Sequence, residues 1–335
     1  MSQRLKTLIV FDTNSLRSTE AGEVAYSFFA FGRPFQVIEE FIIEKNLTDD
    51  IQIAIPTWAI EELKDQKLRQ YKTDIVEFQK LTTRLSGLPH IPEITLPSVE
   101  FDCATYIREK ALAYLANKQI KLLEINEENA HTVLRSMMTR VMKEEGKKKP
   151  FAHSGKYKDA GFKDNIVWES LMHFEGIVDF DKIIFITKDT DYTNCQFEFQ
   201  DKWNKHFTIT SDENCAIAEI TKDYGNYIEE RSIHDFADKE YFRDYLFDQL
   251  KLKTEIAING SNFKIENFVI ENPCTLVERM PPSDEGDEYI IIHSQIIIHF
   301  TAAGEKKQQV VMAQTELADE ESKEIIQTTY DIELI

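Results

Sequence analysis

The sequence has no long apolar run and no closely spaced cysteines. Among its 335 residues, no apolar stretch approaches the roughly 20 residues that a membrane span requires. The N-terminal residues pass almost at once into Leu8-Ile9-Val10-Phe11, without the apolar region and cleavage site of a secretion signal. The four cysteines, at positions 103, 195, 215 and 274, lack zinc-like spacing and indicate free thiols in a reducing compartment. We therefore expect a cytoplasmic globular protein.

Positive charge is also scarce. The chain has 39 Lys and Arg against 59 Asp and Glu, a formal net charge of −20, which argues against broad adhesion to nucleic acids or anionic membranes. From residue 229 onward, 23 acidic residues face 10 basic ones, which leaves 36 against 29 for the first 228 residues. The C-terminal third is thus a poor candidate for phosphate contact, and the shift in charge supports a domain boundary near 225–250. A local basic patch or a bound metal could still offset the field elsewhere.

No glycine-rich phosphate loop follows any early strand, which disfavours a generic nucleotide-binding α/β domain. Short, continuously apolar runs alternate instead with helical periodicity, the pattern of a parallel sheet flanked by helices. The predicted strands are 7–11, 51–55, 182–187 and 206–210. Helices are expected at 35–46, from Thr57, and near 213–222, with a helical insertion over about 73–145.

The period becomes strand-like after residue 251. Runs of alternating residues are separated by Asn259-Gly260 and by Pro281-Pro282-Ser283-Asp284, which predicts an antiparallel domain of about five strands. The expected organisation is therefore an α/β domain over 1–225, a helical linker over 226–250 and a β-rich domain over 251–335. The sequence indicates no chemistry for the last of these.

Acidic residues follow the predicted strands of the first domain. Asp12 follows strand 7–11, Asp189 and Asp191 follow strand 182–187, Glu62 lies on the helix after strand 51–55, and Asp164 is expected in the first turn of a helix. Since the carboxyl ends of parallel strands meet at one edge of a sheet, we expect these side chains to converge there. Two alternatives remain open from the residues alone: Asp12 also suits a helix N-cap, and Glu61-Glu62 also suits a solvated helix face.

Four converging carboxylates would raise one another's pKa values unless cations lay between them. Ligands that are all oxygen suit Mg²⁺ or Mn²⁺. Such a centre could activate a water molecule and neutralise the attacking and leaving oxygens of a phosphodiester.

The most basic stretch of the chain, 143–158, leads into the helix of Asp164. Phe151 and Tyr157 are interleaved among its lysines. A solvated loop is one interpretation; the other is an arm that contacts phosphates and stacks on bases. The candidate nucleic-acid contacts are Lys147, Lys148, Lys149, Lys156, Lys158 and Lys163.

Four segments resemble, in order, the signature blocks of PIN-domain nucleases. They are Phe11-Asp12-Thr13-Asn14, Glu61-Glu62-Leu63, Phe162-Lys163-Asp164-Asn165-Ile166-Val167 and Ile186-Thr187-Lys188-Asp189-Thr190-Asp191-Tyr192. The chain is most similar to a PIN-like branch of bacterial proteins with a Pro-Phe stretch, here Pro150-Phe151, before a Gly-Phe-Lys-Asp stretch, here 161–164.

The resemblance spans about residues 5–220 and implies a Mg²⁺- or Mn²⁺-dependent endonuclease that usually acts on RNA. Carried over by position, it implies Asp12, Glu62, Asp164 and Asp189 as catalytic metal ligands, and Asp191 as a further acidic ligand. It also implies Asn14 and Thr187 as hydrogen-bonding residues behind those ligands.

We therefore expect an endoribonuclease that hydrolyses single-stranded RNA with a metal-activated water. By analogy with the family, a toxin or an antiviral defence effector is the expected cellular role. The C-terminal β domain is expected to bind a protein partner or a second copy of the chain. The alternatives are a DNA or flap nuclease with the same site, and a catalytically inactive PIN-like interaction protein.

Overall fold

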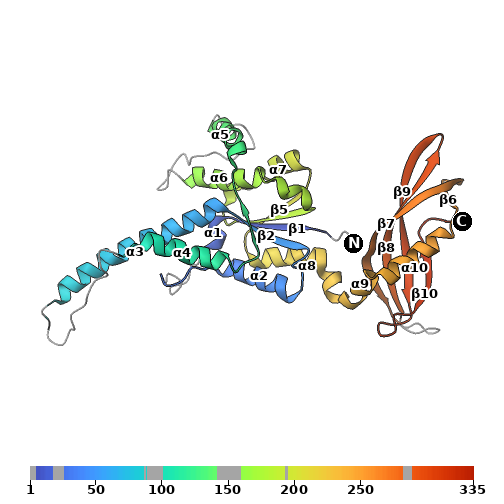
Figure 1. Cartoon of the computed structure of the whole chain (residues 1–335), viewed down its shortest axis with the longest axis horizontal. Coiled ribbons are helices and arrows are strands. Elements are labelled where there is room, and N and C mark those ends of the chain that lie inside the picture. The colour runs from blue at the N-terminus through green and yellow to red at the C-terminus, as the bar shows by residue number, and fades with distance from the viewer. Residues whose placement is uncertain are drawn as a thin grey trace. The chain divides into compact units, whose positions relative to one another are not determined.

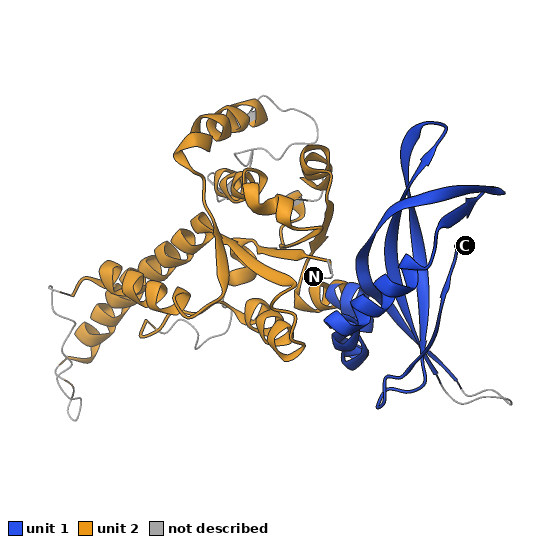
Figure 2. Cartoon of the chain, turned by 45° about the vertical axis from the view of Figure 1, so that its right-hand side comes forward, with its two compact units in different colours: residues 1–4, 220–335 blue, residues 5–219 orange. Residues whose placement is uncertain are grey.

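The chain folds into two compact units, residues 5–219 and residues 220–335 (Figure 2). The structure is a computed structural model, and it describes residues 5–17, 26–86, 88, 101–141, 160–192, 195–281 and 289–335. The division falls inside one helix, α8 (Glu213–Glu229), close to the start of the boundary region that the charge distribution suggests. No helix in these residues is long and apolar enough to cross a membrane.

The first unit is built on a five-stranded parallel sheet with strand order β3-β2-β1-β4-β5. Its strands are β1 (Thr7–Phe11), β2 (Ile51–Pro56), β3 (Ile120–Leu123), β4 (Lys182–Ile186) and β5 (His206–Thr210). Every residue of β1 and β4 is buried, as expected for central strands covered by helices on both faces. The predicted α/β sheet with flanking helices is confirmed.

Helices cover both faces of this sheet (Figure 1). On one face, Val167 and Trp168 of α6 and Phe199 of α7 pack against Leu8 and Phe185 of the central strands. On the other face, the ring of Phe11 lies 5.6 Å from that of Phe35 on α2. The helices of this unit, besides α8, are α1 (Thr13–Leu16), α2 (Arg33–Glu44), α3 (Thr57–Leu85), α4 (Cys103–Leu115), α5 (Glu127–Val141), α6 (Ala160–Met172) and α7 (Cys195–Trp203), with 3₁₀ turns η1 (Glu175–Asp179) and η2 (Thr190–Tyr192).

The expected helical insertion contains a strand. β3 lies between α4 and α5 and pairs in parallel with β2 at the edge of the sheet. Only Leu123 of its four residues is buried, so the strand has no apolar alternation by which the sequence could reveal it. Helix α3 begins at Thr57 as expected; the Thr57 hydroxyl donates to the carbonyl of Leu123 in β3 (3.3 Å), and the N-cap residue is Pro56.

The second unit is an antiparallel sheet with strand order β10-β9-β8-β7-β6, as the alternating pattern predicts. Its strands are β6 (Glu255–Ile258), β7 (Ser261–Met280), β8 (Tyr289–Ala302), β9 (Glu305–Leu317) and β10 (Ile325–Tyr330). Asn259 and Gly260 both have positive φ (52° and 76°) and form the tight turn between β6 and β7.

The segment expected to be a linker belongs to the core of this second unit. It forms α9 (Arg231–Ala237) and α10 (Glu240–Lys251). Ile233 and Phe236 of α9 and Phe242 of α10 are buried in one cluster with Val277 and Ile292 of the sheet. These helices therefore give an antiparallel sheet the apolar cover that one of its faces requires.

Candidate active site

Asp12 stands where β1 ends, and both of its carboxylate oxygens are engaged by the fold. The residue is 1% exposed. Its Oδ1 accepts a hydrogen bond from the backbone N–H of Thr13 (2.7 Å), which caps α1, and its Oδ2 accepts one from the hydroxyl of Thr187 (3.0 Å). The two interpretations of Asp12 from the sequence are therefore compatible, because one carboxylate both caps a helix and lies at the carboxyl edge of the sheet.

Thr187 connects the ends of the two central strands. Its hydroxyl donates to Asp12 and accepts from the backbone N–H of Asp189 (3.0 Å). A hydroxyl has one proton to give and lone pairs to receive another, so both roles are filled at once. The backbone N–H of Asp12 also donates to the carbonyl of Ile186 (3.0 Å). The ends of β1 and β4 are thus held together at the point where the acidic residues emerge.

Tyr192 brings a third acidic position to this edge. It is fully buried, and its hydroxyl donates to the backbone carbonyl of Asp164 on α6 (3.0 Å). Burial raises the pKa of the Tyr192 phenol well above its ordinary value, and the nearby carboxylates of Asp12, Asp164 and Asp189 raise it further. The Tyr192 hydroxyl therefore connects the segment after β4 to α6 at Asp164, and the charges of three predicted site residues act on it.

Asp164 lies deeper in its helix than the sequence suggests. It is the fifth residue of α6, and no acidic residue lies in the first turn. The expected stabilisation of its carboxylate by the helix dipole is therefore weaker than at the N-terminus, because that effect decays within about one turn. The helix itself is held by its apolar side, with Val167, Trp168 and Leu171 in the core.

Glu62 and Glu61 point to different environments. Glu61 has a side chain that is 52% exposed and pairs with Lys64 one turn away (2.6 Å). Glu62 is only 15% exposed; its Oε1 accepts from Gln66 (3.1 Å) and lies 3.7 Å from the Nζ of Lys163. Of the two glutamates, Glu62 is the one directed towards α6, where Lys163 immediately precedes Asp164.

The remaining predicted residues are described less fully. Asn14 is half-buried on α1. Asp191 lies in η2, but its side chain is not among those that the structure describes. The basic segment of the sequence lies outside the described residues, and with it the candidate contacts Lys147, Lys148, Lys149, Lys156 and Lys158.

The donors at this edge suit a hard divalent cation. They are carboxylate and hydroxyl oxygens, the ligand type that Mg²⁺ and Mn²⁺ prefer. The hydroxyls of Thr13 and Ser15, on the helix that Asp12 caps, are buried without a hydrogen-bond partner among the described residues. In that same part of the chain, no three Asp, Glu, His or Cys side chains lie close enough together to hold an ion as they stand.

A comparison with known families accounts for this arrangement. A family model of the PIN domain matches residues 9–192, more than half of the chain. The chain belongs to the PIN-domain family. The match runs from β1 to Tyr192 and includes Asp12, Glu62, Asp164 and Asp189. No curated protein matches the chain. PIN domains are typically metal-dependent nucleases, so nuclease-type activity is the general activity of this unit.

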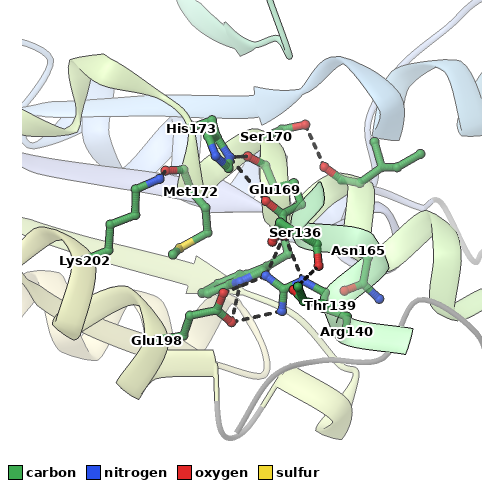
Figure 3. A network of polar contacts seen from close by, with 12 residues as sticks. Ser136, Thr139, Arg140, Asn165, Glu169, Ser170, Met172, His173, Glu198 and Lys202 are labelled. Atoms are coloured by element: carbon green, nitrogen blue, oxygen red, sulfur yellow. Dashed lines mark hydrogen bonds and ion pairs between the residues drawn. The ribbon is translucent and has the colours of Figure 1, made fainter. Parts of the chain in front are cut away.

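A network of buried ion pairs joins α5, α6 and α7 in the PIN domain (Figure 3). The guanidinium of Arg140 on α5 donates to Glu169 on α6 at 2.8 and 2.6 Å. It also donates to both carboxylate oxygens of Glu198 on α7, at 3.0 and 2.7 Å. The Arg140 side chain is 0% exposed, so the network fastens three helices together from inside.

The electrostatics of the network keep Glu169 ionised. Burial raises the pKa of the Glu169 carboxyl, but hydrogen bonding from His173 and Ser136 and the charge of Arg140 outweigh burial and hold that pKa below its ordinary value. The indole of Trp168 donates to Glu198 (3.3 Å), and its ring lies 6.2 Å from the ring of Tyr192. Contacts therefore continue from the network to the phenol of Tyr192.

Sequence reasoning missed three features of the site. Tyr192 lies in the last of the four segments that resemble PIN signature blocks, but no role was predicted for it. Its place directly after Asp189 and Asp191 could have indicated a residue of the site. The partners of Arg140 lie 29 and 58 residues away, a spacing that no local pattern reports. Gln66, which contacts Glu62, and Arg17, which contacts Gln66, also gave no signal.

Proposed function

We propose that this protein is a Mg²⁺- or Mn²⁺-dependent endoribonuclease that cuts single-stranded RNA. One observation supports the proposal: hydrogen bonds through Thr187 and Tyr192 bring Asp12, Asp164 and Asp189 to the carboxyl edge of a PIN-domain sheet. Acidic residues that far apart in sequence meet at the place where parallel α/β sheets carry their active sites.

The residues that would hold the cation are Asp12, Glu62, Asp164 and Asp189, with Asp191 as an additional acid. When bound, a divalent cation supplies a Lewis acid for phosphodiester hydrolysis and lowers the pKa of water. Thr187 fixes Asp12 through its side chain and Asp189 through its backbone. Tyr192, kept protonated by burial and by the surrounding carboxylates, fixes α6 through the carbonyl of Asp164.

Substrate binding must overcome the negative charge of the chain. Lys163 lies beside the acidic residues and contacts Glu62, so a cation is available within the site for a substrate phosphate. The lysines and aromatic residues of 143–158 are proposed to add contacts to backbone and bases, which favours a single strand with accessible bases.

The test is a cleavage assay with Mn²⁺ on single-stranded RNA and on DNA of the same sequence. We expect the wild-type chain to cut RNA internally, and Asp164→Asn to lose roughly a hundredfold or more of the rate, as when one preorganised electrostatic group is removed from an active site. The matched control is Asp201→Asn, the same substitution at an exposed position of α7, which should cut at the wild-type rate.

Each result of this assay has a clear meaning. Equal cutting by Asp164→Asn and Asp201→Asn would contradict the assignment of the site. Preferential cutting of DNA would replace the ribonuclease by a DNA or flap nuclease with the same residues. If no substrate were cut and calorimetry detected no Mn²⁺ binding, the fold would be an interaction platform instead.

We also propose that the nuclease acts as a toxin or a defence effector in the cell, by analogy with other PIN domains. Induced expression of the wild-type chain should then slow growth, whereas Asp164→Asn expressed to the same level should not. Equal growth of the two strains, with the enzyme active in extracts, would contradict this role.

A further inference from the structure

A line of polar contacts runs beside Glu62, from α1 across α3 to α6. The Nε of Arg17 donates to Oε1 of Gln66 (2.8 Å), and the Nε2 of Gln66 donates to Oε1 of Glu62 (3.1 Å). The Nζ of Lys163 lies 3.7 Å from the same glutamate oxygen. A cation therefore stands at each end of this line, with a proposed metal ligand between them.

The position of Arg17 follows from the short helix α1. Asp12 caps the N-terminus of this helix, and Arg17 is the residue at its C-terminal end. The same four-residue helix thus carries a proposed metal ligand at one end and an arginine at the other. Because Gln66 engages Arg17 and Glu62 together, the arginine is tied to the acidic edge by side-chain contacts as well as by the chain.

The guanidinium of Arg17 has donors to spare. The residue is exposed, and Gln66 occupies only its Nε. The two Nη groups donate to no other residue in the described ranges. An arginine presents five donors in a planar fork that matches the oxygens of a phosphate.

No acidic side chain of the described residues pairs with Arg17, unlike other cations nearby. Lys64 pairs with Glu61 (2.6 Å), and Arg69 pairs with Asp65, each within one turn of α3. Within this part of the chain the partner of Arg17 is a neutral amide, which leaves the positive charge to a ligand. In a chain with a net charge of −20, such a cation at the edge of a carboxylate site is suited to hold an anion.

We propose that Arg17 is a substrate-positioning residue that binds a backbone phosphate of the RNA strand beside the bond that is cut, with Gln66 holding its guanidinium in place. The proposal rests on the proposed function in that the strand is the substrate. It assigns a role in binding the strand and none in the chemical step. Charge-assisted bonds between arginine and phosphate supply both affinity and geometry.

The test measures binding separately from cleavage. A fluorescein-labelled single-stranded RNA is titrated with the full chain carrying Asp164→Asn, at several KCl concentrations, and affinity is read from fluorescence anisotropy. Each phosphate contact on a single strand contributes about 0.7 to the slope of log affinity against log salt. We expect Arg17→Met to reduce the slope by about this amount, and Arg17→Lys to keep it with weaker affinity. Arg69→Met, which removes a charge that is already paired, should leave the slope unchanged.

The same substitutions in the otherwise wild-type chain separate binding from chemistry. Arg17→Met should raise KM about tenfold with little change in kcat, because the lost contact is equal in the ground state and the transition state. Gln66→Met should raise KM by a smaller factor while it preserves the salt slope. Since Arg17 is exposed, its variants should have the melting temperature of the wild type.

Equal salt slopes for Arg17→Met and Arg69→Met would overturn the proposal, as would a chain that does not bind RNA. A chain that binds RNA with an Arg17-dependent slope but never cuts it would overturn the nuclease proposal and leave this one standing. If the wild type and Arg17→Met both cut RNA with the same KM, the nuclease proposal would stand and the Arg17 proposal would be overturned.

Discussion

Each unit of the chain contains an arginine that binds two glutamates, and the two arginines lie in opposite environments. Arg140 in the first unit is 0% exposed and joins Glu169 to Glu198. Arg279 in the second unit is 38% exposed and joins Glu230 to Glu320. The chemistry of the side chains is the same, so the difference in their surroundings decides what each cluster contributes.

The acidic residues as a whole follow the same division. The second unit carries most of the excess negative charge, yet none of its described acids is buried, and Glu278 (42% exposed) and Glu320 (47% exposed) lie on the surface. The first unit has a smaller excess of acidic residues, but Asp12 and Glu169 are each 1% exposed and accept hydrogen bonds from neighbouring residues. The comparison teaches that the burial and convergence of acids, and not their number, mark a candidate site.

Removing the two arginines provides the strongest test of this comparison. Arg140→Met leaves the buried Glu169 and the half-buried Glu198 without their cation and should lower the free energy of unfolding of the first unit by about 3–5 kcal/mol. Arg279→Met removes an exposed pair and should lower that of the second unit by about 0–1 kcal/mol. Urea unfolding measures both when it is followed by tryptophan fluorescence, since the three tryptophans all lie in the first unit, and by far-UV circular dichroism for the whole chain. Equal losses would mean that burial does not separate the two clusters.

Two buried threonines, one in each unit, allow effects on stability to be separated from effects on activity. Thr187→Val removes the hydroxyl between Asp12 and Asp189, and Thr315→Val removes the one that bonds to Thr328 in the second unit (2.9 Å). Thr187→Val should lower stability by about 1–3 kcal/mol, because buried Asp12 loses this donor. Thr315→Val should lower it by about 0.5–1.5 kcal/mol, because Thr328 keeps its bond to Tyr245 (3.2 Å). Only Thr187→Val should also reduce RNA cleavage, by about 10- to 100-fold, as when a residue that orients a ligand is lost. An equal loss of cleavage in both variants would point to a general effect on folding.

Acid pH should weaken the first unit through Glu169. Its carboxyl has a lowered pKa in the folded state, so the unfolded chain binds more protons and stability rises with pH. The contribution is present above the ordinary glutamate pKa and is lost as pH falls through the lower folded value. Urea unfolding between neutral and acid pH should therefore show a steeper decline for the wild type than for Glu169→Gln. Parallel declines would assign the acid sensitivity to other carboxylates.

The smallest effect is expected on the outer face of the second sheet. Val269 of β7 (47% exposed) and Val310 of β9 (43% exposed) both pair with Ile297 of β8, which makes an apolar row across three strands. If this face binds a second copy of the chain, Val269→Lys with Val310→Lys should shift the mass measured by light scattering towards the monomer. Stability should change by no more than about 0.5 kcal/mol, as for other surface substitutions. An unchanged mass would direct attention to other surfaces.

The sequence predicted the elements whose structure depends on neighbouring residues in the chain. β1 and β4 were recognisable because strands buried on both faces are apolar throughout, and Asp12 and Asp189 followed from where those strands end. The turn at Asn259-Gly260 was recognisable because its positive φ angles require such residues. β3 was not, because three of its four side chains are not buried and its place in the sheet depends on pairing with β2.

The parts of the site that the sequence did not reveal are tertiary. Arg140 meets Glu198 from 58 residues away, and Arg17 meets Gln66 from 49 residues away. Nothing in the neighbourhood of any of these residues distinguishes it from a surface charge or amide. The same applies to Phe236 and Phe242. From sequence their helices resemble an acidic linker, and only their packing against the second sheet shows that they belong to its core.

The bonds of Asp12 bear on how related sequences should be interpreted. The fold employs the side chain of Asp12, which caps α1 and accepts a hydrogen bond from the hydroxyl of Thr187. A descendant that had abandoned catalysis would still need an acceptor at position 12 to stay folded. Retention of that aspartate is therefore a poor guide to whether a homologue is an enzyme.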